Sequence, residues 1–312
     1  MRDGKLQQSI CDATGGGVVA SVTSIQSVWA GYGELFRCHL SDAPVDTVVV
    51  KHVTPPKGRG HAHQRKLRSY EVEAHFYRQH APRCDDGCRV ASCFGAQRVD
   101  KGWLLIMEDL DAAGFSGRDR DPRGRRLDAT LAWLANFHVM FMHERPRGLW
   151  KTGTYWHLAT RPDEFAAMAD GPLRRAAKAL DAKLANAEFQ TWVHGDAKPA
   201  NFCFSRDGRV AAVDFQYVGV GCGIKDVAYL LSGTDPATVE RGLDHYFAVF
   251  RKAWARRGKP DAEADLIETE WRELYAVAWA DFQRFLAGWA PSWRPLRHEA
   301  EMTRNALAQL AR

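Results

Sequence analysis

The chain has 312 residues, of which 46% are hydrophobic and 26% are charged, so it can form an ordinary core and is not a disordered chain. Its 43 basic and 38 acidic residues give a net charge of +5, an excess too mild to indicate a nucleic-acid-binding protein. Seven scattered cysteines argue against a disulfide framework and favour a reduced, cytoplasmic location. There is no signal-peptide core and no apolar run near the roughly 20 residues that cross a membrane, so we expect no membrane association.

The first third of the chain predicts a small antiparallel sheet with one helix. Two β-rich runs, at 21–29 and 36–40, flank the turn Ala30-Gly31-Tyr32-Gly33-Glu34. A third run, Thr47–Val53, carries a single lysine and ends just before two prolines. Beyond it we predict a mobile basic loop at 58–65, a helix at 65–80, and strands at 90–97 and 102–107.

The remainder of the chain predicts a mainly helical part. The pattern changes after residues 108–110, where a loop rich in Gly and Arg occupies 114–126. Helical periodicity then recurs at 127–143, 172–188, 238–255, 262–286 and 297–310. Two short strands, at 202–204 and 210–213, are joined by a turn at 206–208. We therefore expect two parts, residues 1–107 and residues 108–312.

The segment 191–231 carries the residues with the clearest chemistry. His194-Gly195-Asp196 is followed by Asn201 and then by Asp214 in an apolar Asp-Phe-Gln run. Phosphoryl transfer needs a carboxylate that orients the attacking hydroxyl, and oxygen ligands for the magnesium that bridges the nucleotide phosphates. Asp196 suits the first role, and Asn201 and Asp214 suit the second. His-Gly-Asp alone is a weak signal, but the full spacing predicts a phosphotransferase.

These motifs resemble the kinase-like phosphotransferases, a group that includes aminoglycoside phosphotransferases, choline kinases and ecdysteroid-kinase-like proteins. The match looks closest to the ecdysteroid-kinase-like proteins, through the motifs at 214–217, 226–229 and 281–289. The resemblance spans nearly the whole chain and implies an α+β, bilobal fold. Residues 1–107 would form a small antiparallel-sheet lobe that binds nucleotide, and residues 108–312 a mainly helical lobe with the catalytic loop and acceptor site. ATP and Mg²⁺ would bind between the lobes.

The resemblance assigns the nucleotide-binding residues one by one. Lys51 looks like the strand lysine that contacts phosphates, and Glu73 like the helix glutamate that pairs with it, with Glu71 as a competitor. The shortened glycine loop would be Gly31, Tyr32 and Gly33, and the backbone of the hinge would bind adenine at Glu108 and Leu110. Taken alone, such a lysine is most often an edge-strand charge. The shared order of the motifs is what indicates a kinase.

The catalytic loop also resembles that of protein kinases. Lys198, two residues after Asp196, is placed to neutralise charge on the transferring phosphoryl group. However, Gly195 stands where protein kinases have an arginine, and Asp226 follows Asp214 by only 12 residues, which leaves no platform for a peptide. We therefore predict that the acceptor is a small hydroxylated molecule. A catalytically silent nucleotide-binding scaffold is the alternative, and a protein kinase is a less favoured one.

Candidate acceptor contacts are aromatic residues and one carboxylate. In the resembling family the C-terminal helices wall the acceptor pocket, which points to Tyr155, Trp156, Tyr275, Trp279 and Asp281. Aromatic faces with a carboxylate suit a cationic acceptor or a flat apolar one, and the sequence leaves both open. The sequence also leaves open whether the nucleotide is ATP or GTP. No obligate protein partner is predicted.

Other conspicuous residues have a structural interpretation. The spacing of Cys84, Cys88 and Cys93 matches no common zinc pattern, so ordinary thiols are expected. His138 lies in an apolar helix and is expected to be a hydrogen-bonded core histidine. We expect Asp226 to anchor the catalytic loop from the following helix.

Overall fold

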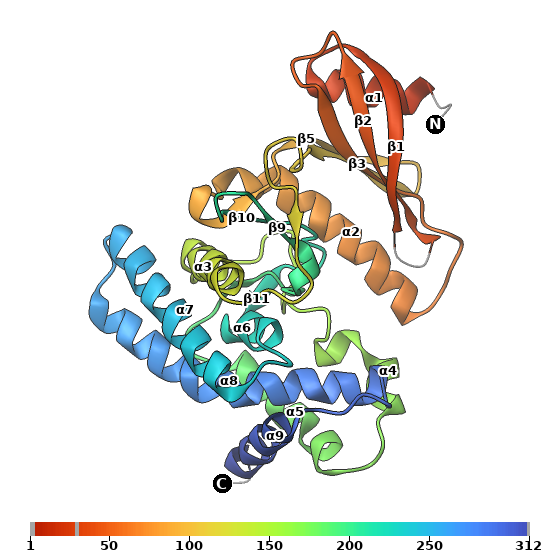
Figure 1. Cartoon of the computed structure of the whole chain (residues 1–312). Coiled ribbons are helices and arrows are strands. Elements are labelled where there is room, and N and C mark those ends of the chain that lie inside the picture. The colour runs from red at the N-terminus through yellow and green to blue at the C-terminus, as the bar shows by residue number, and fades with distance from the viewer. Residues whose placement is uncertain (1–3, 29–30, 311–312) are drawn as a thin grey trace. The chain divides into compact units, whose positions relative to one another are not determined.

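The computed structural model describes residues 4–28 and 31–310 and divides into two compact units, shown in Figure 1. The first unit contains Met1–Arg118 and Phe202–Gln216, and the second contains Asp119–Asn201 and Tyr217–Arg312. Antiparallel strands and helices make the fold α+β, as predicted. A single boundary after Met107 was expected, but here the chain returns to the first unit for residues 202–216. Trp29, predicted at the end of the first β-rich run, and Ala30, predicted in the turn after it, lie outside the described residues.

A five-stranded antiparallel sheet forms the first unit. Its order is β1-β2-β3-β6-β5, built from β1 (Val18–Val28), β2 (Gly33–Ser41), β3 (Thr47–Val53), β6 (Gly102–Glu108) and β5 (Cys93–Val99). Successive side chains of a strand point to opposite faces, so Val50 joins the core on one face of β3 while Lys51 points to the other. This alternation places the lysine away from the core formed with the first helix.

Helix α1 (Gly4–Thr14) covers that core and was not predicted. Leu6 and Ile10, one turn apart, pack against Phe36, Val50 and Leu104 of the sheet. Leu6, Ile10 and Ala13 form a narrow apolar stripe, and most of the other side chains of the helix are polar. A short segment with so little apolar surface gains its helical stability from the tertiary contact.

Helix α2 (His61–Gln79) begins four residues earlier than predicted and includes most of the expected loop at 58–65. Tyr70, Ala74 and Tyr77 are buried on one face, as their spacing predicted. Glu73 is buried on the same helix, with 1% of its surface exposed. Short 3₁₀ turns η2 (Ala81–Arg83) and η3 (Asp86–Cys88) follow.

A second, four-stranded sheet completes the first unit, in the order β4-β10-β9-β7. Its strands are β4 (Arg89–Val90), β10 (Val210–Ala212), β9 (Phe202–Phe204) and β7 (Gly117–Arg118). The β9–β10 hairpin confirms the two strands predicted around the turn at 206–208. The strand predicted at 90–97 is instead two strands in different sheets, and β7 lies inside the predicted loop at 114–126.

The second unit is mainly helical. It contains α3 (Arg125–Met140), η4 (Leu158–Thr160), α4 (Pro162–Ala167), α5 (Pro172–Ala185), η5 (Pro199–Asn201), α6 (Ile224–Leu230), α7 (Pro236–Arg256), α8 (Asp261–Trp289) and α9 (Arg297–Leu310), with a two-stranded ribbon of β8 (Thr191–Val193) and β11 (Gly219–Gly221). Helix α7 starts cleanly because Asp235 accepts a hydrogen bond from the Thr238 backbone N–H at 3.0 Å and Pro236 opens the first turn.

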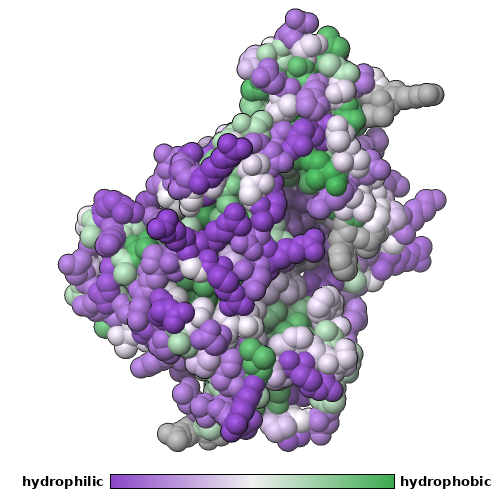
Figure 2. Space-filling view, in the orientation of Figure 1, coloured by the Kyte–Doolittle hydropathy of each residue, from purple (hydrophilic) through white to green (hydrophobic). Residues whose placement is uncertain are grey.

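Helix α8 lies at the centre of an aromatic core. Trp156, Trp279, Phe282 and Phe285 form one buried cluster, with Leu286 beside them. Most of the face seen in Figure 2 is hydrophilic, as expected when the large apolar side chains are inside. Among the described residues, no helix combines the length and apolarity that crossing a membrane requires.

Candidate active site

The catalytic loop of the second unit follows β8 and is held by a buried carboxylate. Asp226, in the first turn of α6, accepts hydrogen bonds from the backbone N–H of His194 at 2.6 Å and of Gly195 at 3.0 Å. His138 Nε2 lies 3.3 Å from the same carboxylate, and its Nδ1 lies 2.7 Å from the Tyr246 hydroxyl. The predicted anchoring role of Asp226 and the predicted core role of His138 are both confirmed.

Gly195 is required by the shape of this loop. Its φ is +79°, a conformation that side chains disfavour. A Cβ at this position would also lie 2.2 Å from the Tyr217 carbonyl oxygen and 2.8 Å from the Thr154 backbone nitrogen. The loop therefore has no room for the arginine that protein kinases carry here.

Asp196 projects from the loop with an organised set of partners. Lys198 Nζ lies 2.8 Å from Asp196 Oδ2, and Asn201 Nδ2 lies 3.1 Å from the same oxygen. Asn201 Nδ2 also donates to the Asp196 backbone oxygen at 2.8 Å. Since the amide nitrogen of Asn201 is used in this way, its carbonyl oxygen is the atom suited to a cation. The structure brings together three residues predicted as catalytic or metal-binding.

Tyr229, for which the sequence predicted no role, contacts the same carboxylate. Its hydroxyl lies 3.5 Å from Asp196 Oδ1 and accepts a hydrogen bond from the Tyr155 hydroxyl at 3.3 Å. Burial, and then the charge of Asp196, raise the pKa of Tyr229 well above its usual value. The phenol therefore stays protonated and donates to the carboxylate. The signal available in the sequence was its position one helical turn after Asp226 on α6.

In the first unit, Lys51 and Glu73 form the predicted ion pair. Lys51 Nζ lies 2.7 and 2.9 Å from the two carboxylate oxygens of Glu73, and 3.4 Å from Asp214 Oδ1. Glu71, the competing candidate, bonds Arg68 at 2.8 Å at the surface of the helix. The geometry thus selects Glu73 as the partner.

The charges of this pair are set by burial and by each other. Burial raises the pKa of Glu73 to about 7, against the opposing effect of the Lys51 charge. Burial also acts to lower the pKa of Lys51, but the carboxylates of Glu73 and Asp214 outweigh it and raise that pKa above its usual value. Lys51 therefore remains a cation at neutral pH, as a phosphate-binding lysine must.

The Asp-Phe-Gln segment follows β10 and packs on α2 within the first unit. The Phe215 ring stacks on Phe76 with centroids 4.0 Å apart. Asp214 has a φ of +70°, and 31% of its side chain is exposed. Its Oδ1 accepts a hydrogen bond from Gln216 Nε2 at 2.6 Å. A partly exposed carboxylate next to a buried lysine suits a magnesium ligand, since Mg²⁺ uses one or two side chains together with substrate phosphates.

The predicted glycine loop is described from Gly31 onward. A Cβ on Gly33, whose φ is +143°, would lie 2.0 Å from the His52 carbonyl oxygen, so β2 can approach β3 only with glycine here. Tyr32 is buried, and its hydroxyl lies 2.6 Å from His63 Nδ1 on α2. These contacts explain the conformation of the loop. Its role in binding phosphate stays a prediction.

The predicted hinge is fixed by ion pairs. The Glu108 carboxylate bonds Arg89 at 2.5 and 2.6 Å, and the Glu108 backbone N–H donates to the Ser92 carbonyl oxygen at 2.8 Å. Burial acts to raise the pKa of Glu108, but hydrogen bonds from Arg89 and Ser92 outweigh it and lower that pKa. Leu110 is buried, and its carbonyl oxygen accepts from the Phe115 N–H at 2.7 Å. Adenine binding by the backbone at Glu108 and Leu110 stays a prediction.

Most of the predicted acceptor contacts lie inside the second unit. Trp156, Tyr275, Trp279 and Asp281 are between 0 and 6% exposed. Asp281 bonds Arg284 at 2.8 Å and the Trp156 indole N–H at 3.1 Å, with Lys225 Nζ at 3.4 Å. The resemblance suggested these four residues as acceptor contacts. Their side chains pack inside the second unit, and contact with an acceptor stays a prediction for them. Tyr155 alone of the five lies beside the catalytic loop, where its N–H bonds the Gly195 carbonyl oxygen at 2.9 Å.

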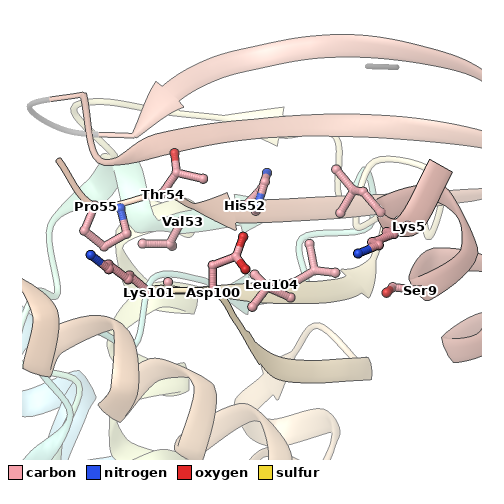
Figure 3. Close-up of a pocket in the computed structure, with 12 residues that line it drawn as sticks. Lys5, Ser9, His52, Val53, Thr54, Pro55, Asp100, Lys101 and Leu104 are labelled. Atoms are coloured by element: carbon pink, nitrogen blue, oxygen red, sulfur yellow. The ribbon is translucent and has the colours of Figure 1, made fainter. Parts of the chain in front are cut away.

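A cavity of about 520 Å³ in the first unit is separate from these residues. It is lined by α1, the end of β3 and the turn before β6 (Figure 3). His52 lines it, and because neighbouring strand residues alternate, the cavity faces the side of the sheet opposite to Lys51. None of the predicted site residues is part of its lining.

The seven cysteines are free thiols, and Cys84 and Cys88 lie close enough to hydrogen-bond. Within residues 4–28 and 31–310, no group of three or more His, Cys, Asp or Glu side chains is arranged to hold a metal ion.

Both the sequence and the structure of the chain are similar to those of known proteins. The profile of the phosphotransferase enzyme family (APH) matches residues 25–259. The structure is similar to choline kinase LicA from Streptococcus pneumoniae, with a TM-score of 0.51, 15% identity and 94% of each chain covered. It is also similar to a thermostable mutant of aminoglycoside phosphotransferase APH(4)-Ia in complex with ADP and hygromycin B, with a TM-score of 0.50, 11% identity, and 98% of this chain and 96% of that chain covered. No curated protein sequence matches the chain. The predicted closeness to ecdysteroid-kinase-like proteins stays a prediction.

Proposed function

We propose that this chain, which belongs to the phosphotransferase enzyme family, is a kinase that transfers the γ-phosphoryl group of ATP to a hydroxyl of a small molecule. The observation that carries the proposal is the arrangement around Asp196, where Lys198 and Asn201 converge on one carboxylate oxygen. The loop that presents these groups is fixed by Asp226 and requires glycine at position 195. The buried Lys51–Glu73 pair in the first unit supports the same function.

In this proposal Asp196 orients the acceptor hydroxyl and takes its proton. Lys198 reduces the negative charge that develops near the transferred group, which is the usual role of a cation in phosphoryl transfer. Tyr229 donates to the second carboxylate oxygen and so restricts the orientation of Asp196. Transfer is direct and in line, and no phosphorylated enzyme forms.

The other residues hold the nucleotide and its metal. Magnesium with ATP supplies the electrophilic phosphoryl group and neutralises charge on the phosphates. We propose that Asn201 and Asp214 bind the ion through oxygen atoms, which are the ligands that Mg²⁺ prefers. Lys51, positioned by Glu73, contacts phosphate as a buried cation.

The aromatic surroundings of Tyr155 support an acceptor with an apolar face over a cationic one. Asp281, the carboxylate that suggested a cationic acceptor, is already neutralised in the core by Arg284 and Lys225. The guanidinium of Arg161 lies over the Tyr155 ring, 5.6 Å from its centroid, and is paired with Glu164 at 2.8 Å. We propose a hydroxylated acceptor with an apolar face that contacts Tyr155 and Tyr229.

A panel of alcohols tests the function and the acceptor class together. Nucleotide consumption is measured with ATP and with GTP against aminoglycosides, choline, neutral aromatic or polycyclic alcohols, and their anionic derivatives. We expect turnover with a neutral or anionic alcohol and a phosphorylated product detectable by mass spectrometry. Nucleotide binding without phosphoryl transfer to any alcohol would favour the scaffold alternative, and efficient transfer to the cationic alcohols would contradict the acceptor class.

Replacing Asp214 with alanine is expected to abolish most magnesium-dependent turnover, because it removes the anionic ligand. The fold is expected to persist, since the Asp214 side chain is partly exposed and Phe215 still packs on α2. Turnover over a range of Mg²⁺ concentrations and the melting temperature are the measurements. An Asp214→Ala enzyme with nearly normal activity would remove Asp214 from the proposed metal site.

Protein substrates are expected to remain unlabelled by radiolabelled ATP. Asp226 follows Asp214 by only 12 positions, and β11 and the start of α6 occupy much of that interval. Casein, histone and myelin basic protein are suitable test substrates, with a known protein kinase as the positive control. Efficient labelling of any of them would contradict the assignment to small-molecule acceptors.

A further inference from the structure

We infer that Gln216 is a positioning residue for Asp214, and that Ser69 of α2 holds Gln216 in its working orientation. The inference rests on the proposed function, because it takes Asp214 to be a ligand of the magnesium ion. It adds two residues to which neither the sequence motifs nor the resemblance assigned a role.

Gln216 links the carboxylate to the helix through both ends of its amide. Its Nε2 donates to Asp214 Oδ1 at 2.6 Å. Its Oε1 accepts from the Ser69 hydroxyl at 3.1 Å, and that hydroxyl lies 2.9 Å from the Lys66 carbonyl oxygen. Ser69 has no exposed surface. Because an ionised carboxylate only accepts hydrogen bonds, the Nε2 end of the amide faces Asp214 and the Oε1 end faces Ser69.

The same face of α2 is also linked to Asp214 through the Lys51–Glu73 ion pair. Ser69 and Glu73 are four residues apart and therefore lie one above the other on the helix. Glu73 bonds Lys51, and Lys51 Nζ lies 3.4 Å from Asp214 Oδ1. The contacts form a closed ring from α2 through the ion pair to Asp214, and back through the amide to α2.

Both arms of the ring meet on one oxygen of Asp214. Two donors on Oδ1 restrict the rotation of the carboxylate, and hence the direction in which it faces a metal ion. The backbone at Asp214 also needs support, since a φ of +70° is unusual for a residue with a side chain. Packing of Phe215 on Phe76 and the bond from Gln216 provide that support within the same unit.

The consequence is that metal affinity depends on α2 through Gln216. Groups that hydrogen-bond a metal ligand typically contribute about 10- to 100-fold to metal affinity or activity. Gln216→Met keeps the length of the side chain but removes both amide groups, so it tests the link without opening a large cavity. Ser69→Ala removes only the outer bond and is expected to have a smaller effect in the same direction.

The experiment measures binding of AMP-PNP, which is not transferred, by titration calorimetry with and without Mg²⁺. The ratio of the metal-free Kd to the Kd with Mg²⁺ reports the coupling between metal and nucleotide, independently of turnover. We expect Gln216→Met to lower this ratio about 10- to 100-fold relative to the wild type while changing the metal-free Kd little. The double variant with Ser69→Ala is expected to be no worse than Gln216→Met alone, because both residues act through one link.

Two control variants match the substitutions elsewhere in the chain. Thr130→Ala in α3 removes a buried hydroxyl that bonds the Arg126 carbonyl oxygen at 2.9 Å, which resembles the bond from Ser69 to Lys66. Gln283→Met in α8 removes a buried amide that bonds Thr303. Both controls are expected to change the melting temperature only, and to leave the metal-dependent ratio as in the wild type.

Asp214→Asn separates the inference from the function on which it rests. If Asp214→Asn brings the ratio of Kd values close to 1 while Gln216→Met leaves it at the wild-type value, the inference is overturned and the metal role of Asp214 stands. If Asp214→Asn has the same ratio of Kd values as the wild type, the metal assignment of Asp214 fails and the inference fails with it. A Gln216→Met protein that melts at a lower temperature but has the wild-type ratio would show a purely structural role and also overturn the inference.

Discussion

Asp196→Asn is expected to lower turnover by about 10²- to 10⁴-fold, or about 3–5 kcal/mol in activation free energy, which is the usual contribution of a positioned general base. Asparagine keeps the size of the side chain and an oxygen that accepts from Lys198 and Asn201. It lacks the charge that orients and deprotonates a hydroxyl. The effect is therefore expected in kcat, measured with the acceptor that the panel of alcohols identifies.

Nucleotide affinity and melting temperature are expected to change little in this variant. Lys51 and Asp214 belong to the first unit and keep their contacts, and Asp226 still anchors the loop. Asp207→Asn, in the exposed turn between β9 and β10, is the matched control and is expected to be fully active. If Asp196→Asn melts early, binds ATP weakly and yet turns over normally per folded molecule, Asp196 is a structural carboxylate and the mechanism is wrong.

The features that the sequence predicted well are those encoded over short distances. Strand β3 follows from a run of β-branched residues, and the β9–β10 hairpin from two apolar runs around a turn. The catalytic loop belongs to this class, since His194, Asp196 and Asn201 lie in one short segment and their spacing is typical of phosphotransferases. Anchoring by Asp226 is an exception, because the backbone N–H groups of His194 and Gly195 that it accepts from are 32 and 31 residues away in the sequence.

The features that the sequence missed depend on contacts between distant segments. Residues 202–216 join the first unit because β10 pairs with β4, and two-residue strands carry too little pattern to show such a partner. Gln216 and Ser69 are 147 residues apart, so their bond has no local signature. Helix α1 has only a narrow apolar stripe, and its stability comes from the sheet that it covers.

The predicted acceptor contacts depend on packing that the sequence pattern does not show. Helical spacing shows that Trp279 and Asp281 belong to a long helix with aromatic residues, but it does not show what that helix packs against. In the structure both are inside the second unit, and Asp281 is paired with Arg284 one turn later. A carboxylate in an apolar helix therefore has two interpretations, as a ligand-binding group or as a buried ion pair.

Asp281→Ala distinguishes these interpretations and is expected to lower the free energy of unfolding by about 3–5 kcal/mol, the usual cost of breaking a buried ion pair from one side. Arg284 and Lys225 would remain buried, and both are within 3.4 Å of the missing carboxylate in the wild type. Urea denaturation at pH 7 measures the loss. Glu301→Ala, which removes an exposed partner of Arg297, is the control and is expected to cost less than about 1 kcal/mol.

The same variant has a pH signature that a ligand-binding carboxylate would lack. Burial acts to raise the pKa of Asp281, but the charges of Arg284 and Lys225 outweigh it, so the pKa in the folded protein lies below the usual 3.8. A depressed pKa contributes stability that is present above the unfolded value and is lost as pH falls through the folded one. The stability difference between wild type and Asp281→Ala should therefore be constant at neutral pH and shrink below about pH 4. A variant of normal stability whose acceptor KM is raised would instead return Asp281 to the acceptor site.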